Sequence, residues 1–313
     1  MTEDKIGIFG EVREYPDPAA ARRFASLVGL DEMKERLLKE ASLLLNPESL
    51  AGWATKHHHK GVKIVDFFRD RPALFIFAGD VGTGKTILAE TFGDAVAREA
   101  NIAVTLYGLS LNARGTGAVG EMTALLSAAF AEVKQAAKKG RGRGTKHNSA
   151  VILLIDEADA LAQSRELDQM HHEDRAGVNA LIRGVDELAT ASLPAIVVMC
   201  TNRLEALDPA IRRRAAVIFT FERPNETQRM AFLKPVLEEL GFTTEQIRSV
   251  VTETGETHGR SYGYTYSDLA QRLLPGLLLA AYPAGPITFE IFKDVIERHP
   301  PTPPFRESQI GVS

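Results

Sequence analysis

The chain has 313 residues, of which 44% are hydrophobic and 25% are charged, and its formal net charge is −4. This composition is that of a folded globular protein with room for about two domains, and the charge gives no general attraction to nucleic acid or anionic membranes. The single cysteine, Cys200, excludes an intrachain disulfide, and no apolar stretch reaches the roughly 18 residues of a membrane span, so we expect a cytoplasmic protein without membrane contact.

The N-terminal 25 residues are charged and contain Pro16 and Pro18, which indicates an arm rather than a domain. Apolar residues with helical spacing follow over 27–45. Three consecutive histidines at 57–59 cannot all reach one metal ion from a regular element. We therefore expect a solvated loop there.

The sequence GDVGTGKT at 79–86 lies between an apolar run at 73–78 and an amphipathic segment at 87–99. A strand, a glycine-rich loop and a helix in this order form a cradle of backbone N–H groups for phosphates. Lys85 is expected to reach the outer phosphates and Thr86 to bind Mg²⁺. The residues predicted to contact the nucleotide here are Val81, Gly82, Thr83, Gly84, Lys85, Thr86 and Ile87.

A second chemical signal follows the apolar run at 151–155, which ends in Asp156 and Glu157. Such a short, uniformly apolar run is typical of a parallel strand that is buried on both faces. Because the carboxyl ends of parallel strands line one crevice, Asp156 is expected beside the Mg²⁺ and Glu157 opposite the γ-phosphate. Glu157 would then orient or deprotonate the attacking water.

Two motifs later in the chain fit the same chemistry. The strand at 195–200 is followed by Asn202, whose amide is expected to hold the lytic water together with Glu157. Three arginines at 212–214 precede the last apolar run, and a planar guanidinium suits phosphoryl charge that develops in a transition state. Three in a row cannot all face the nucleotide of their own subunit, so at least one is expected to reach a neighbouring subunit.

Strands and helices alternate up to residue 223, which predicts an αβα, doubly wound parallel sheet of five strands. After Arg223-Pro224 only helical segments follow, and Pro275 is expected to kink or split the third of them, 266–282. We divide the chain into an arm (1–25), a nucleotide-binding domain (26–223), a small helical domain (224–300) and a C-terminal tail (301–313).

Taken together, the chain resembles the AAA+ ATPases over roughly residues 26–298, because the loop at 79–86, the sequence VILLIDEAD at 151–159, Thr201-Asn202 and the segment 208–214 occur in the family's order and spacing. The resemblance implies a helical lid, Mg-ATP between core and lid, and usually a hexameric ring, here a homohexamer. It also implies that Asn202 is the first sensor, that Arg213 or Arg214 is a finger acting in trans, and that Val28 and Gly29 touch the adenine.

Within this superfamily, two stretches resemble the ATPases that remodel HORMA-domain proteins. One comprises 178–181 and 185–188 with an arginine segment that ends at Arg214-Ala215, and the other runs from Arg272 to Phe289. The short N-terminal arm resembles the bacterial branch of these ATPases, found beside cGAS-like nucleotidyltransferases (CD-NTases) in antiphage signalling (CBASS). The resemblance implies an ATPase that opens or disassembles a HORMA-domain protein and so switches the synthase off.

Three positions depart from the family pattern. The first pore loop usually carries an aromatic residue before a Gly-Glu pair, but the candidate substrate-pore residues here are Ala118 and Val119. Either Leu111, Arg114, Val119 or the backbone grips the substrate, or the ring engages its substrate differently. The position of the second sensor arginine is occupied by Leu269, so either Arg272, one turn later, replaces it or another residue of the lid senses the nucleotide. Which of the arginines at 212–214 is the finger stays open.

Two other functions compete with protein remodelling. The basic, glycine-rich stretch 138–146 is predicted to be a solvated loop, but its alternative role is a nucleic-acid contact in an AAA+ loader or remodeller. The acidic overall balance makes that the weaker hypothesis. A nucleotide-binding scaffold without turnover is disfavoured because both Glu157 and Asn202 are present.

Overall fold

The computed structural model describes residues 7–45, 47–111, 120–140, 147–161 and 171–304. The chain divides into two compact units. The first comprises residues 1–26, 32–78 and 86–220, and the second comprises 27–31, 79–85 and 221–313. The second unit therefore combines the C-terminal part of the chain with two short earlier segments, one of which is the glycine-rich loop.

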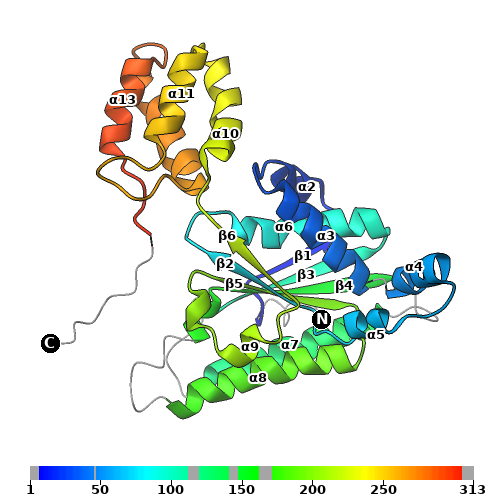
Figure 1. Ribbon diagram of the computed structural model, residues 1–313. Coiled ribbons are helices and arrows are strands. Elements are labelled where there is room, and N and C mark those ends of the chain that lie inside the picture. The colour runs from blue at the N-terminus through cyan, green and yellow to red at the C-terminus, as the bar shows by residue number, and fades with distance from the viewer. Residues whose placement is uncertain (1–6, 46, 112–119, 141–146, 162–170, 305–313) are drawn as a thin grey trace. The chain divides into compact units, whose positions relative to one another are not determined.

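A six-stranded sheet in the order β1-β3-β4-β5-β2-β6 forms the centre of the first unit (Figure 1). The strands are β1 (Glu11–Tyr15), β2 (Leu74–Gly79), β3 (Ala103–Ser110), β4 (Ser149–Asp156), β5 (Ala195–Thr201) and β6 (Val217–Phe221). The pairs β3/β4, β4/β5 and β2/β5 are parallel, whereas β1 runs antiparallel to β3. All seven residues of β5 are buried, as expected for a central strand.

The predicted αβα sheet is confirmed, but in the described part of the chain it has six strands instead of the predicted five. The extra strand, β1, lies in the segment 1–25 that the sequence indicates to be an arm, and it is antiparallel. An edge strand pairs through its backbone and can expose charged side chains, so it needs no apolar run. Only Tyr15 in β1 is buried, at 3% exposure.

Helices cover both faces of the sheet. Figure 1 shows α7 and α8 on one face and α2, α3 and α6 on the other. The helices of this unit are α2 (Pro18–Ala25), α3 (Asp31–Leu45), α4 (Pro47–His58), α5 (Lys63–Arg69), α6 (Lys85–Ala100), α7 (Glu121–Lys139), α8 (His171–Thr190) and α9 (Pro209–Arg212). His57 and His58 lie in the last turn of α4 rather than in the expected loop, and both are exposed.

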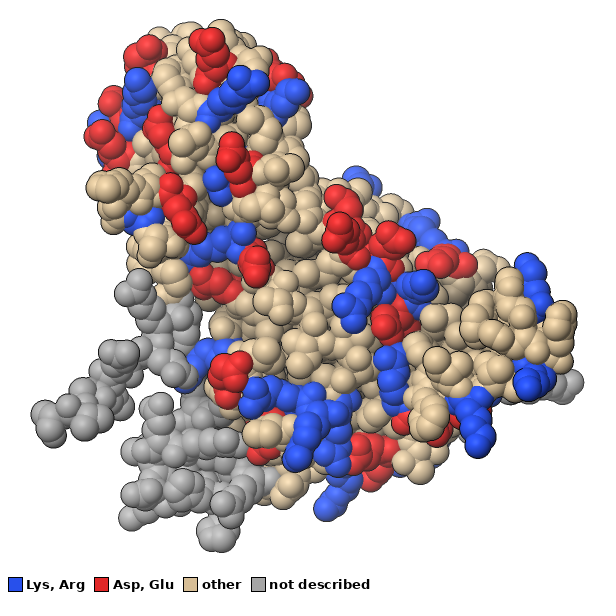
Figure 2. Space-filling view, in the orientation of Figure 1, with Lys and Arg blue, Asp and Glu red and all other residues tan. Residues whose placement is uncertain are grey.

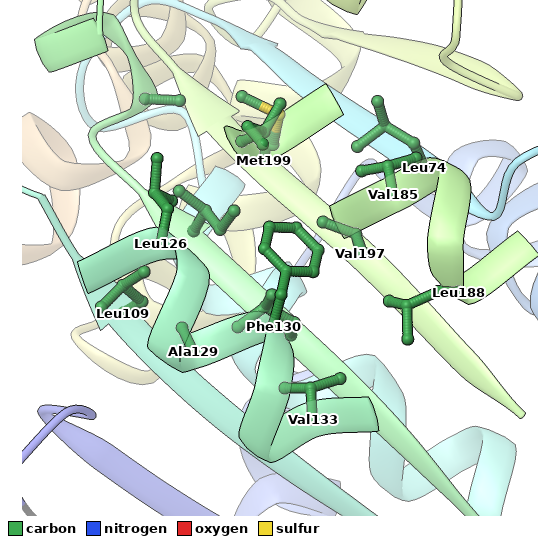
Figure 3. Packing of buried hydrophobic residues seen from close by; sticks show 14 of the residues in the cluster. Leu74, Leu109, Leu126, Ala129, Phe130, Val133, Val185, Leu188, Val197 and Met199 are labelled. Atoms are coloured by element: carbon green, nitrogen blue, oxygen red, sulfur yellow. The ribbon is translucent and has the colours of Figure 1, made fainter. Parts of the chain in front are cut away.

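The core beneath α7 explains the glycine at position 184 of α8. Phe130 of α7 points toward β5, where Val197 and Met199 lie, and is flanked by Val185 of α8 (Figure 3). A Cβ atom at Gly184 would lie 2.2 Å from the Phe130 ring. Glycine in α8 therefore allows the two helices to pack closely over the sheet.

The second unit is helical apart from the two short segments. Its helices are α10 (Glu226–Glu239), α11 (Thr244–Glu253), the π-helical segment η5 (Asp268–Leu273), α12 (Leu274–Ala281) and α13 (Phe289–Arg298). The helix expected at 266–282 is thus split, with Pro275 in the first turn of α12, where its missing N–H costs no hydrogen bond. Among the described residues, no helix is both long and apolar enough to cross a membrane.

Candidate functional site

The first unit brings Thr86 and Asp156 together. Thr86 lies in the first turn of α6 and Asp156 at the end of β4, and the Thr86 Oγ1 donates a hydrogen bond to Asp156 Oδ2 at 3.1 Å. A hydroxyl and a carboxylate are the hard oxygen ligands that Mg²⁺ prefers, and this ion commonly binds one or two protein oxygens together with phosphates. The pair therefore fits the metal-binding role that the sequence predicts.

Glu157 is held in a defined position next to Asp156. Its backbone is left-handed, with φ of +55°, a conformation that costs a non-glycine residue about 1–3 kcal/mol. Its carboxylate Oε2 accepts a hydrogen bond from Ser110 Oγ at 3.0 Å, and its N–H donates to Asp156 Oδ1 at 2.9 Å. Ser110, at the end of β3, is a partner that the motif search missed, although it ends a strand at the same edge of the sheet.

The end of β5 is anchored by a third acidic residue, Asp159. Its carboxylate, on a residue with 7% exposure, accepts hydrogen bonds from the Asn202 backbone N–H at 3.2 Å and from Thr201 Oγ1 at 3.3 Å. Asn202 thus stands at the carboxyl end of the strand beside β4, with its side chain half-buried. The motif spacing gives roles to the first two carboxylates of the sequence Asp156-Glu157-Ala158-Asp159 but does not indicate that the third, Asp159, holds the end of β5.

The glycine-rich loop belongs to the second unit, where its own carbonyls hold Lys85. The Lys85 Nζ donates to Gly79 O at 2.9 Å and to Asp80 O at 2.7 Å, and the residue is only 6% exposed. Thr83 Oγ1 also donates to Asp80 O, at 2.8 Å. By contrast, Val81 and Ile87 are exposed, at 48% and 37%.

Two segments of the second unit pack against this loop. Gly82 has φ of +76°, and a Cβ atom there would lie 2.7 Å from Thr265 Oγ1 and 2.8 Å from Ser267 Cβ. A Cβ at Gly84 would contact Leu27 and Leu30 at 3.6 and 3.7 Å, so the segment 27–31 also lies beside the loop. Only glycine combines this backbone conformation with so close an approach at position 82.

The predicted adenine segment, Val28-Gly29, is fixed by α10. Gln228 Nε2 donates to Gly29 O at 2.7 Å, and the same side chain completes the capping box of α10 with Asn225. Gly29 has φ of +74°, and a Cβ there would lie 2.7 Å from Tyr266 Oη. Burial, followed by the nearby charge of Asp31, raises the pKa of Tyr266 to about 12, so this hydroxyl stays protonated at neutral pH.

The three consecutive arginines have different surroundings. Arg214 forms a two-pronged ion pair with Asp186 of α8, at 2.9 and 3.1 Å, and Arg212 pairs with Glu205 at 2.9 Å. The Arg213 side chain is exposed and makes no hydrogen bond or ion pair with any described residue. Basic side chains gather around α8 and α9 in this view (Figure 2). Of the two predicted finger residues, Arg213 is therefore the one whose guanidinium the described part of its own chain leaves available.

The structure describes the second-sensor candidates but only one of the candidate residues for gripping a substrate in the pore. Ala118, Val119 and Arg114 lie outside the described residues, as does the segment 141–146 of the basic stretch. Leu111 is 1% exposed and belongs to the core of the first unit, so the proposal that it grips a substrate is wrong for this conformation. Leu269 is fully buried in the core of the second unit, whereas Arg272 pairs with Asp268 at 3.1 Å.

Comparisons with known proteins agree with this geometry. The family model for the ATPase family associated with various cellular activities (AAA) matches residues 75–223. The chain is 53% identical over 295 residues to CD-NTase-associated protein 6 of Escherichia coli strain MS 115-1. The aligned region covers 94% of this chain and 95% of that protein.

Solved structures are similar over the same extent. A chain in the structure of the E. coli MS115-1 HORMA:CdnC:Trip13 complex is 52% identical, with a TM-score of 0.88, and the match covers 95% of this chain and 97% of that one. The structure of Rhizobiales Trip13 is 44% identical, with a TM-score of 0.73, and covers 95% and 100% of the two chains.

Proposed function

Because this chain belongs to the family of CD-NTase-associated protein 6 and is an AAA ATPase, we propose that it uses ATP hydrolysis to open or disassemble a HORMA-domain protein. This remodelling switches off a cGAS-like nucleotidyltransferase in bacterial antiphage signalling. The observation that carries the proposal is the match, over 97% of its length, to a chain that was solved together with HORMA and CdnC.

The carboxyl edge of the sheet supports the hydrolytic step. Thr86 and Asp156 would hold Mg²⁺, which neutralises phosphate charge when it is bound. Glu157, held by Ser110 and by its own backbone geometry, orients the attacking water and accepts its proton. Asn202, at the end of the adjacent strand, supplies the amide that positions the same water.

The loop at 79–85 supports nucleotide binding. The Lys85 ammonium group donates hydrogen bonds to the carbonyl oxygens of Gly79 and Asp80. Because the lysine side chain is flexible, it can replace these hydrogen bonds with contacts to the outer phosphates of ATP. Val28 and Gly29 contribute backbone groups to adenine binding, next to the loop residues 81–85. In this proposal the segment 79–85 binds the phosphates and the segment 27–31 binds the base, and both segments belong to the second unit.

Arg213 supports assembly into a ring. An exposed arginine without a partner in the described part of its own chain is suited to stabilise transition-state charge at the site of a neighbouring subunit. We propose a cytoplasmic homohexamer in which each Arg213 acts in trans. Arg214 instead holds α9 against α8 through Asp186.

A trapping experiment tests the remodelling proposal. The variant Glu157→Gln should bind ATP and retain a purified HORMA-domain protein on a sizing column, because hydrolysis no longer releases it. The matched control Lys85→Ala should retain none, because it does not bind nucleotide. If both variants behave alike toward the HORMA-domain protein, ATP-driven remodelling of that partner is refuted.

The nucleic-acid alternative has its own signature. ATPase activity that is stimulated by DNA or RNA, and that falls steeply as salt rises, would favour a role for the stretch 138–146. Within this stretch, Lys138 and Lys139 end α7 and are exposed. No contact in the described part of the chain favours this second function over the first.

A further inference from the structure

The glycine-rich loop contains a carboxylate, Asp80, at a place where a triphosphate is to bind. Its carboxylate accepts a hydrogen bond from the Val81 N–H at 2.8 Å, and its carbonyl accepts from Lys85 and Thr83 at 2.7 and 2.8 Å. Asp80 is therefore the residue around which the loop is organised. It also places a negative charge beside an anion site, which opposes nucleotide binding unless the charge is compensated.

Arg223 compensates this charge. Its Nε and Nη2 donate to Asp80 Oδ2 at 2.8 and 2.5 Å, and the two side chains are only 14% and 18% exposed. Charge pairs that are this little exposed interact much more strongly than pairs on the surface, because water screens them less. Arg223 and Asp80 belong to the same compact unit although 143 residues separate them.

The remaining donors of Arg223 fix it to two further segments. Its Nη1 donates to Gly263 O at 2.6 Å, and its Nη2 donates to Thr302 O at 2.8 Å. The guanidinium carbon also lies 5.1 Å from the centre of the Tyr262 ring, within the range of a cation–π contact. Arg223 thus cannot turn away from Asp80 without breaking contacts on several sides.

The contacts from Thr302 lead back to the phosphate loop. Thr302 donates to both carboxylate oxygens of Asp268, from its N–H at 3.1 Å and from its Oγ1 at 2.7 Å. Ser267, the residue before Asp268, donates its N–H to Gly82 O at 3.1 Å. The loop is therefore held at Asp80 and at Gly82 by two ends of one hydrogen-bonded network.

We infer that Arg223 is a positioning residue for the phosphate loop, which neutralises Asp80 and holds the loop in a shape and charge state that accept the ATP phosphates. The inference rests on the proposed ATP site but not on the protein partner. It assigns Arg223 to nucleotide affinity and leaves the hydrolytic step to Glu157 and Asn202. In this assignment Arg223 acts through Asp80 and has no direct part in the reaction.

Nucleotide affinity of the full chain tests the inference. In Arg223→Gln, Asp80 loses the positive charge that this guanidinium supplies, and we expect the Kd for a fluorescent ATP analogue to rise roughly tenfold or more. Adding Asp80→Asn to that variant should recover most of the loss, because the repelling charge is gone while the amide oxygen of the new side chain can still accept from the Val81 N–H. The ATPase assay should show a raised KM with a kcat close to that of the parent.

Two further variants separate charge from folding. Arg223→Lys keeps the charge and should bind nucleotide nearly as the parent does. Asp80→Asn alone should bind it at least as tightly, since Arg223 then adds an uncompensated positive charge. Arg260→Gln serves as the control, because Arg260 holds backbone carbonyls of Glu253 and Gly255 in the same unit; its Kd should stay at the parental value.

The results that would overturn the inference are specific. An unchanged Kd in Arg223→Gln refutes it, and so does a double variant that binds as weakly as Arg223→Gln. If Arg223→Gln does not fold, the test is made with Asp80→Asn alone, and nucleotide binding weaker than that of the parent then refutes the inference. Failure to remodel a HORMA-domain protein, with these Kd changes as expected, would refute the proposed partner and leave the role of Arg223 standing.

Discussion

Arg213 and Arg214 are adjacent and chemically identical, yet the structure predicts opposite consequences when each is replaced by alanine. Arg214 forms an ion pair with Asp186 whose side chains are 34% and 43% exposed, worth about 0.2–1 kcal/mol. Its hydrogen bond to Ala210 O, at 3.2 Å, adds about 0.5–1.5 kcal/mol. Arg214→Ala should therefore destabilise the protein by about 1–2 kcal/mol and lower its Tm by roughly 2–8 °C.

Arg213→Ala removes an exposed side chain that makes no hydrogen bond or ion pair with the described part of its own chain, so the stability should change by less than about 0.5 kcal/mol. If Arg213 is the trans finger, its loss should lower kcat by about 10³-fold or more, while the affinity for nucleotide is retained. Calorimetry and a steady-state ATPase assay, run on both variants, measure the two effects separately.

Mixing the subunits tests action in trans. Subunits with Arg213→Ala keep an intact nucleotide site, and subunits with Lys85→Ala keep an intact arginine, so a mixed ring should regain part of the activity. If Arg213→Ala hydrolyses ATP at the parental rate and Arg214→Ala is the inactive variant, the assignment of the finger from its surroundings is wrong.

Three other changes have defined outcomes. Glu157→Gln should leave nucleotide affinity intact and lower kcat by about 10²-fold or more; hydrolysis at the parental rate would remove Glu157 from the mechanism. Gly184→Ala places a Cβ 2.2 Å from the Phe130 ring and should lower the free energy of unfolding by about 1–3 kcal/mol, whereas Gly10→Ala, with open space around it, should not. Burial raises the pKa of Asp268, but hydrogen bonds from Thr302 and Thr265 outweigh this effect and hold the pKa below the ordinary value of 3.8. The stability that the Asp268 carboxylate contributes at neutral pH should therefore be lost as the pH falls through the lowered pKa. The difference in unfolding free energy between the parent and Asp268→Asn should accordingly be smaller at acid pH than at pH 7.

The sequence was sufficient for the central strands and for the pairing of Thr86 with Asp156. Apolar runs identify buried strands directly, and the carboxyl ends of parallel strands meet at one edge, so residues 70 positions apart could be placed together. The same reasoning missed β1, because three of its five residues are charged, so that it contains no apolar run, and it pairs at the edge of the sheet.

Side-chain partners within the site could not be predicted from spacing. Nothing in the order of residues indicates that Asp186 forms its ion pair with Arg214, 28 positions later, while Arg213 stays exposed. Asp159 and Ser110 were overlooked for a related reason, since both serve the chemistry by holding other residues. Leu269 occupies the position of the family's second sensor arginine. Its burial in the core of the helical unit follows from the packing of that unit and could not be predicted from the sequence.

The output of the nucleotidyltransferase tests the central claim most directly. The cyclase-like synthase, its HORMA-domain activator and this chain are mixed with ATP, and the nucleotide product is measured over time. We predict that the parent chain suppresses product formation at substoichiometric amounts, and that Lys85→Ala and Glu157→Gln at the same amounts do not. Suppression that is equally strong with the hydrolysis-deficient Glu157→Gln, or none with the parent chain, would contradict ATP-driven remodelling.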